Sequence, residues 1–171
     1  MTDFHVLTKD ALLEEISRGW AELNRALDKL TPEQLSGPTD ANGWRVQDHL
    51  SHMGAWHNWA RLRVQGRPSW EGLGITEADV SSGDTDTANA AIRACHAGKT
   101  PAEARAFLTE THDLLVEMLA GLDGAVLSLP FRALGPDEPA DRVIPPVSHI
   151  VYESTAGHYE EHLGWLRGYG V

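Results

Sequence analysis

Residues 9–30 read KDALLEEISRGWAELNRALDKL, and this stretch indicates the fold class. Its apolar side chains recur at steps of three and four residues, which gives one apolar stripe on an α-helix. The stripe consists of Leu12, Leu13, Ile16, Trp20, Leu23, Leu27 and Leu30. Thr8 can cap the helix, and Thr31-Pro32 ends it. The stretch therefore predicts a long amphipathic helix that must pack against other helices.

Three further long segments carry the same period, at residues 44–66, 100–122 and 147–167. The middle one begins with Thr100-Pro101-Ala102-Glu103, which combines an N-cap, a proline at the first helical position and a glutamate three residues after the cap. A shorter helix is predicted at residues 87–97, with a start that could lie as early as Glu77.

The connections between these helices are long. Residues 69–86 show no sustained period and predict a loop with one short helical turn. Residues 124–146 contain five prolines and predict a connection that crosses the bundle or covers a site. With no convincing strand pattern, the sequence predicts an all-α four-helix bundle with long connections, formed as a single domain by residues 1–171. Its helices need not follow simple up-down order.

Composition excludes several classes of protein. The 14 Lys and Arg against 25 Asp and Glu give a net charge of −11, which argues against nucleic acid or an anionic membrane as the main partner. No stretch approaches about 18 apolar residues, and the amino terminus lacks a signal-peptide pattern. The lone Cys95 allows no internal disulfide and is expected to be buried as a small apolar residue. We expect a cytoplasmic protein.

Histidines supply the candidate chemistry. His158 and His162 stand four residues apart on a predicted helix, so both imidazoles can reach one ion. His52, in the middle of another helix, is the candidate third ligand, and His49 lies one turn nearer that helix's end. The alternative for His52 is a core histidine. Three histidines without a fourth protein ligand leave an open position of the catalytic type. Zinc, nickel, iron or manganese would accept this set.

Other side chains could support such a site. Asp48 could accept the second N–H of a ligand histidine, or it could favour the positive end of its own helix. His49 could support the site or pack at the helix end. Trp56, Trp59 and Trp165 could line a substrate pocket, or they could belong to the core; the two are compatible in a bundle.

Two short motifs carry a family resemblance: GWRVQDHLSHMGAW from Gly43 and TAGHYEEHLGWL from Thr155. They resemble the DinB/YfiT-like superfamily of metal-binding four-helix bundles, which includes the ClbS/DfsB type and the amino-terminal domains of mycothiol-dependent maleylpyruvate isomerases. The resemblance implies a metal triad at His52, His158 and His162, one divalent ion (zinc or nickel before iron or manganese), and a homodimer. Arg45 stands where the family usually has Ser or Thr, which weakens capping by about 0.5–2 kcal/mol.

The resemblance also implies a class of function. We expect a metal-dependent enzyme that transfers a low-molecular-weight thiol to an electrophilic small molecule, or hydrolyses that molecule, as in detoxification. The alternative is a bundle that binds a metal and sequesters a small molecule without turnover, or one in which the ion only holds two helices together. The partners expected are therefore a small-molecule substrate and a thiol, with no nucleic acid and no membrane.

Overall fold

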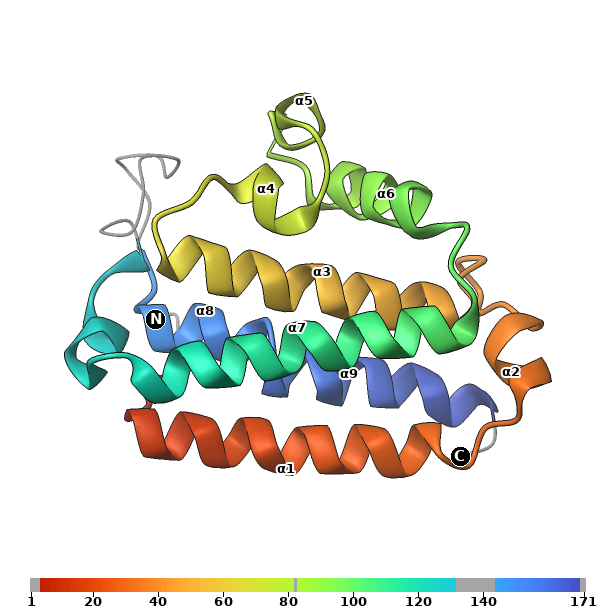
Figure 1. Ribbon diagram of the computed structural model, residues 1–171, viewed down its shortest axis with the longest axis horizontal. Helices are drawn as coiled ribbons and strands as arrows, with labels where there is room; N and C mark the ends of the chain where they lie inside the picture. The colour runs from red at the N-terminus through yellow and green to blue at the C-terminus, as the bar shows by residue number, and fades with distance from the viewer. Residues whose placement is uncertain (1–3, 82, 132–143, 170–171) are drawn as a thin grey trace.

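The computed structural model describes residues 4–81, 83–131 and 144–169. Its framework consists of four long helical segments: α1 (Lys9–Leu27), α3 (Val46–Val64), α7 (Pro101–Gly121), and a last segment made of α8 (Val147–Glu153) and α9 (Ala156–Leu166). Figure 1 shows α1 and the α8–α9 segment running in one direction, and α3 and α7 in the other. The predicted all-α four-helix bundle is confirmed.

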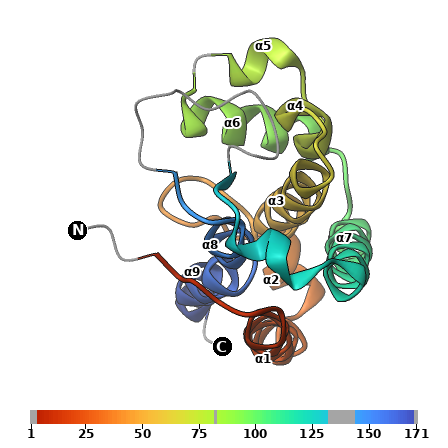
Figure 2. The same ribbon diagram turned by 90° about the vertical axis from the view of Figure 1, so that its left-hand side faces the viewer.

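The order of the helices in space requires a crossover. Seen along the bundle in Figure 2, α3 packs beside α7, and α1 packs beside α9. Because α3 and α7 are neighbours that run in the same direction, the chain between them must return along the length of the bundle. It does so through three shorter helices, α4 (Ser69–Leu73), α5 (Glu77–Val80) and α6 (Thr85–His96).

This crossover contains more helix than the sequence predicts. In place of one short turn, residues 69–86 form α4, α5 and the start of α6. Side-chain caps begin two of these helices: the Asp79 carboxylate accepts from the Thr76 N–H at 2.9 Å, and the Asp84 carboxylate accepts from the Thr87 N–H at 3.0 Å. The periodic pattern misses such short helices because local caps, rather than an apolar stripe, define their starts.

The other connections are short helices and turns. They include α2 (Pro32–Ser36), the 3₁₀ helix η1 (Gly124–Ser128), and a backbone pairing in which the Phe131 N–H donates to the Pro145 carbonyl at 2.9 Å. A further 3₁₀ helix, η3 (Arg167–Tyr169), follows α9. The part of the predicted 124–146 connection that holds Pro136 and Pro139 lies outside the described residues.

The predicted helix starts at Thr8 and Thr100 are confirmed. Thr8 Oγ1 accepts from the Ala11 N–H at 3.3 Å, and Thr100 and Glu103 form a capping box that opens α7. The first helix ends at Leu27, three residues before the predicted end, and α2 follows with its own capping box at Thr31.

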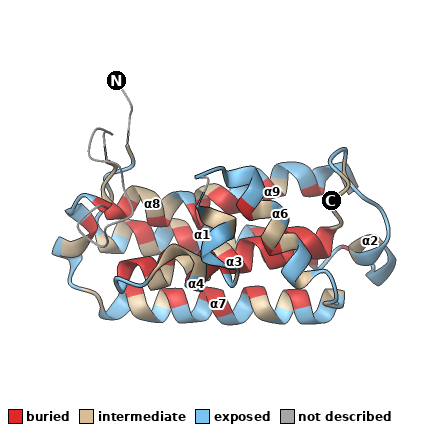
Figure 3. Ribbon diagram, turned by 90° about the horizontal axis from the view of Figure 1, so that it is seen from above, coloured by how far each residue is buried: buried red, intermediate tan, exposed pale blue. Residues whose placement is uncertain are grey.

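Helix α3 lies at the centre of the protein. Residues 46–55 are all buried, and α3 is red over much of its length in Figure 3. This burial follows from its neighbours, because α7, α4, α6 and α9 all pack against it. A helix covered on several sides can hold polar side chains away from water. His49, His52 and His57 all lie on α3, and all three are buried.

The last helical segment is broken, which corrects the prediction of one continuous helix over residues 147–167. The break falls at Thr155, whose φ of −132° and ψ of −96° are not helical. The Ser154 hydroxyl donates to the Ile150 carbonyl at 2.8 Å, and the Thr155 hydroxyl donates to the Val151 carbonyl at 2.6 Å. These bonds to carbonyls four residues back bend helices. As a result α9 starts anew at Ala156, just before His158.

Two further observations concern the surface. Cys95 is exposed, so the expectation of a buried cysteine is wrong; its Sγ lies 3.5 Å from the Gly74 carbonyl. Among the described residues, none of the helices has the combined length and apolar character needed to cross a bilayer.

Candidate metal centre

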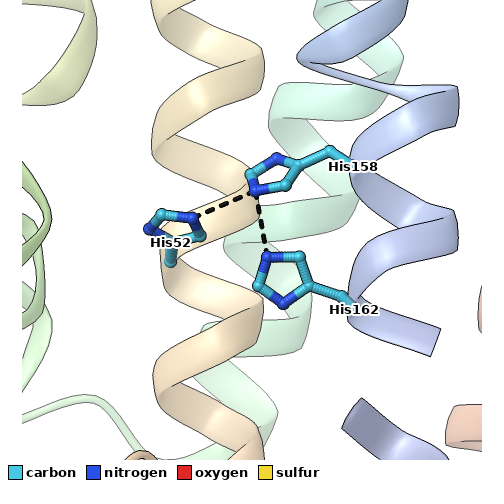
Figure 4. A group of neighbouring side chains, drawn as sticks. All are labelled: His52, His158 and His162. Atoms are coloured by element: carbon cyan, nitrogen blue, oxygen red, sulfur yellow. Dashed lines mark hydrogen bonds between the residues drawn. The ribbon is translucent and has the colours of Figure 1, made fainter. Parts of the chain in front are cut away.

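Three histidine side chains converge between α3 and α9. Figure 4 shows His52 reaching from α3 toward His158 and His162 on α9. The Nε2 atoms of His52 and His158 are 3.0 Å apart, and those of His162 and His158 are 2.9 Å apart. All three side chains are buried, with exposures of 6%, 9% and 1% for His52, His158 and His162. The three residues that the sequence and the family resemblance single out are therefore brought together.

This triangle of nitrogens fits a metal ion better than it fits hydrogen bonding. An imidazole nitrogen carries either one proton or one lone pair. His158 Nε2 lies within hydrogen-bond distance of two other Nε2 atoms, so it cannot form a good bond with both. Nitrogens at about 2.0–2.1 Å from one zinc ion lie about 2.9–3.4 Å apart when the angle between the bonds is about 90–110°. The two separations that involve His158 Nε2 fall within that range, and all three ligand nitrogens lie within 4.8 Å of one another.

Burial keeps these histidines uncharged. Loss of solvent lowers the pKa of His158 to about 4, with a further lowering from His49. Burial also holds the pKa values of His52 and His162 well below the usual value, and the neighbouring histidines add to that effect. At neutral pH the lone pairs are free, which is the state that a metal requires.

The histidine rings are fixed by aromatic packing. Trp44 meets the His52 ring edge-on at 5.3 Å between centroids, and Trp165 packs against His162 at 4.7 Å. The Nδ1 atoms of the three histidines are buried and have no hydrogen-bond partner among the described residues. Carboxylates or carbonyls usually orient metal-bound histidines through that nitrogen. Here ring packing orients them instead.

Asp48 lies at the start of α3 and does not face the triad. Its carboxylate accepts from the Arg45 backbone N–H at 2.9 Å and from the Arg45 guanidinium at 2.8 Å, and Arg93 lies 3.6 Å away. Although burial opposes it, the hydrogen bonds and charge of Arg45 hold the pKa of Asp48 below its usual value. Asp48 therefore does not orient a ligand histidine; it acts at the amino-terminal end of its own helix, which is the alternative given above. Arg45 has no side-chain oxygen to cap α3, and the negative charge of Asp48 in the first turn partly compensates for that loss.

His49 packs beside the triad without joining it. Its Nε2 lies 3.1 Å from the Asp40 carboxylate, and its ring contacts those of His162 and Trp165, at 5.1 and 4.7 Å between centroids. Asp40 is itself held in place, because it accepts from the Trp44 backbone N–H at 2.9 Å. The pair of Asp40 and His49 therefore supports one side of the His162 ring.

A cavity of about 980 Å³ opens next to the three histidines, which form part of its wall. Four tryptophans line it: Trp44, Trp56, Trp59 and Trp165. Three of them are the tryptophans that the sequence offered as pocket residues. Trp44 is not predicted as a pocket residue, because it lies at the start of the predicted 44–66 helix and outside its apolar stripe; in the structure it precedes α3. Its position directly before the histidine-bearing helix was the available signal.

The cavity wall also carries charged residues from several elements. They are Asp40, Asp86, Arg93, Glu153 and Glu161. From the sequence, Glu153 and Tyr159 are candidate general bases, and of these two the cavity wall contains Glu153. The other four charged residues are not predicted as site residues, because each lies on an exposed or irregular part of the chain. Arg93 and Asp86 come from α6, so the crossover helix forms one wall of the cavity.

Two other histidine groups lie outside this centre. His57 and His112 are buried beside Tyr159, whose hydroxyl lies 2.9 Å from His112 Nδ1. The second group brings together His5, His149 and Glu153, whose possible ligand atoms lie within 4.8 Å of one another, but its side chains are partly or fully exposed. No ligand spacing connects these histidines in the sequence, which predicts them at the surface or at helix caps. For His57 and His112 this prediction is wrong, because both are buried in the core.

This geometry defines a helical bundle with a buried three-histidine centre beside an aromatic cavity. A family model for the mycothiol maleylpyruvate isomerase N-terminal domain matches residues 16–149. The chain belongs to this family, and with it to the DinB/YfiT-like superfamily. The matched segment contains His52 and ends before His158 and His162. No curated protein matches the sequence significantly.

Solved structures share the fold at low sequence identity. A protein from Streptococcus pneumoniae is similar with a TM-score of 0.77 and 15% identity, over 96% of this chain and 91% of that one. The colibactin self-resistance protein ClbS, solved in complex with double-stranded DNA, is similar with a TM-score of 0.71 and 19% identity, over 94% of each chain. DfsB, described as a sibling lethal factor precursor, is similar with a TM-score of 0.70 and 13% identity, over 95% of each chain.

Proposed function

We propose that the protein is a metal-dependent enzyme that joins a low-molecular-weight thiol, or water, to an electrophilic small molecule. The observation that carries this proposal is the convergence of His52, His158 and His162 on the wall of a cavity large enough for a small substrate. A bundle that used an ion only as a structural link would have no need of a cavity of about 980 Å³ beside it.

Each part of the site has a task in this proposal. The three histidines hold one divalent ion, with zinc or nickel favoured over iron or manganese. When bound, such an ion lowers the pKa of a thiol or a water molecule and so favours the nucleophilic form at neutral pH. The tryptophans exclude water and hold the electrophile against the histidine wall.

The proton released by the nucleophile needs an acceptor. Glu153 lines the cavity together with the three histidines and offers an exposed carboxylate. Tyr159, the other side chain considered from the sequence, is unsuited to this task. It is absent from the cavity wall, its hydroxyl lies 2.9 Å from His112, and burial raises its pKa well above the usual value. We assign Glu153 or solvent as the acceptor of the nucleophile's proton.

The proposal does not include DNA, although ClbS was solved with a duplex. Phosphate backbones attract proteins through clustered Lys and Arg. This chain carries a net charge of −11, and Arg93, the one Lys or Arg among the described residues of the cavity wall, lies 3.6 Å from Asp48. We infer a small-molecule ligand rather than a nucleic acid.

A turnover assay tests the proposal. Protein loaded with zinc or nickel is mixed with N-acetylcysteine and 1-chloro-2,4-dinitrobenzene. In the expected reaction the thiol sulfur bonds to the ring carbon, chloride leaves, and the thiol proton passes to Glu153 or solvent. Product should exceed the amount of protein and should depend on His158, whereas His149→Ala, which alters the exposed histidine group, should keep activity. Product that stops at one equivalent would favour sequestration instead.

A further inference from the structure

We propose that the cavity selects a flat aromatic ligand that carries a positive charge. The inference rests on the proposed function for its location, and it adds the class of substrate. Two features of the cavity wall carry it: the tryptophans and the distribution of charge.

The tryptophans offer ring faces at fixed positions. Trp56 and Trp59 meet in a T-shaped arrangement with 5.2 Å between centroids. The Trp56 indole N–H donates to the Asn89 side chain at 3.2 Å, which joins α3 to α6 and fixes that ring. Indole rings bind aromatic groups by stacking and bind cations over their faces, and tryptophan is the strongest of the aromatic residues in the second respect.

The charge on the cavity wall is negative. Among the described residues, Asp40, Asp86, Glu153 and Glu161 line it, together with one cation, Arg93. Arg93 is already engaged: it donates to the Gly43 carbonyl, lies 3.6 Å from Asp48 and packs over the Trp44 ring at 5.4 Å. It therefore offers little to an anionic ligand.

Not all of the carboxylates are equally available. Asp40 is committed to His49 and to the Trp44 backbone N–H. Asp86 on α6 and Glu161 on α9 are exposed and face the cavity from different elements. Clefts lined by one sign of charge concentrate ligands of the opposite sign. A divalent ion on the neutral histidines would change the net charge of the described wall residues from −3 to −1, so the wall would stay negative.

The size of the cavity agrees with such a ligand. Its volume of about 980 Å³ lies at the upper end of the range of about 300–1,000 Å³ typical of small-molecule sites. This volume has room for a bicyclic ring with a short cationic arm, and the wall supplies both indoles and carboxylates to contact them. The histidine wall is then left free for the nucleophile.

Three matched probes test this selectivity on metal-depleted protein: 2-naphthylmethylammonium, 2-naphthalenemethanol and 2-naphthoate. Binding is measured by calorimetry and by quenching of tryptophan fluorescence at low salt. We expect the ammonium to bind about tenfold more tightly than the alcohol, from one cation–π contact and one ion pair, and the naphthoate to bind least. Equal or tighter binding of naphthoate, or no binding of any probe, would overturn the inference.

Charge-neutral variants separate the carboxylates from the rings. Asp86→Asn combined with Glu161→Gln should remove most of the preference for the ammonium over the alcohol, while the alcohol still binds. Glu117→Gln, an exposed glutamate on α7 away from the cavity, is the control and should keep the preference. An unchanged preference in the double variant would also overturn the inference. Because these probes need no metal, their failure would leave the metal-dependent function standing, and loss of the metal site would leave their selectivity measurable.

Discussion

The Nε2 atoms of His52 and His158 lie 3.0 Å apart, although 106 residues separate them in the sequence. That contact links α3 to the second half of the last helical segment. His162 adds a nitrogen 2.9 Å from His158, and the three side chains together form a buried, uncharged set of lone pairs. The function of the protein depends on what that set binds.

Metal binding should stabilise the fold. An ion held by α3 and α9 binds the native state and stabilises it by about 2.7 kcal/mol when free metal exceeds the dissociation constant 100-fold. Thermal unfolding followed by circular dichroism, with and without added zinc, measures this. The melting temperature should rise with zinc in the wild type and in His149→Ala, and should not rise in His158→Ala. A similar rise in His158→Ala would place the stabilising site elsewhere.

Acid should destabilise the protein through its buried histidines. Burial lowers the pKa of His112 to about 4, against a usual value of 6.5. As the pH falls below about 6.5, His112 binds a proton in the unfolded state, whereas in the folded state it binds one only near pH 4. The free energy of unfolding therefore decreases as the pH is lowered from about 6.5 to about 4. Replacing His112 with Phe keeps an aromatic ring against Trp20, which stacks on His112 at 3.9 Å, and removes this titration.

Urea unfolding of metal-free protein at several pH values between 7.5 and 4.5 measures the effect. His112→Phe should show a shallower loss of unfolding free energy with falling pH, smaller by about 1–2 kcal/mol over the range. The test is the slope and not the absolute stability at pH 7.5, because the Tyr159 hydroxyl loses its His112 partner in this variant. An unchanged slope would contradict the assignment of His112 as a buried neutral group.

Close packing of α4 on α3 supports the Trp59 wall of the cavity. A Cβ atom on Gly72 would lie 2.5 Å from the Trp59 Cα, which is backbone and cannot move aside easily. Gly72→Ala should therefore destabilise the protein by about 1–3 kcal/mol through overpacking. Gly98→Ala, where a Cβ would meet nothing within 4 Å, is the matched control and should change stability by less than about 0.5 kcal/mol. Equal effects of the two changes in urea unfolding would argue against this packing.

Duplex DNA should not bind, despite the shared fold with ClbS. The net charge of −11 makes phosphate contacts unfavourable, most of all at low salt where charges are least screened. A fluorescence anisotropy titration with a labelled duplex in about 50 mM salt should show no binding at micromolar protein. Saturable binding under those conditions would require a basic surface that the charge distribution does not suggest.

Local patterns in the sequence predicted much of this fold, and long-range geometry supplied the rest. The apolar stripe of residues 9–30 and the caps at Thr8 and Thr100 are local features, and they were predicted correctly. The break at Thr155 was missed because Thr and Ser also occur inside continuous helices; only the bonds to Val151 and Ile150 show which role they play here.

The candidate site also combines features that local sequence patterns predict with features that depend on tertiary packing. The i, i+4 spacing of His158 and His162 follows from helix geometry alone. The choice of His52 over His49 rests on its position nearer the middle of the helix and on the family resemblance, because both histidines lie close to the same apolar stripe. Trp44 and Arg93 reach the cavity from a loop and from the crossover helix α6. Their placement depends on tertiary packing, which no local period encodes.

Metal content of the purified protein tests the central claim most directly. Wild-type protein and the variants His52→Ala, His158→Ala, His162→Ala and His149→Ala are dialysed against zinc or nickel, and elemental analysis is combined with circular dichroism to show that each is folded. The account predicts about one tightly bound ion per chain in the wild type and in His149→Ala, and loss of that ion in each of the other three. Retention of a full equivalent of metal by folded His52→Ala, His158→Ala and His162→Ala would contradict it.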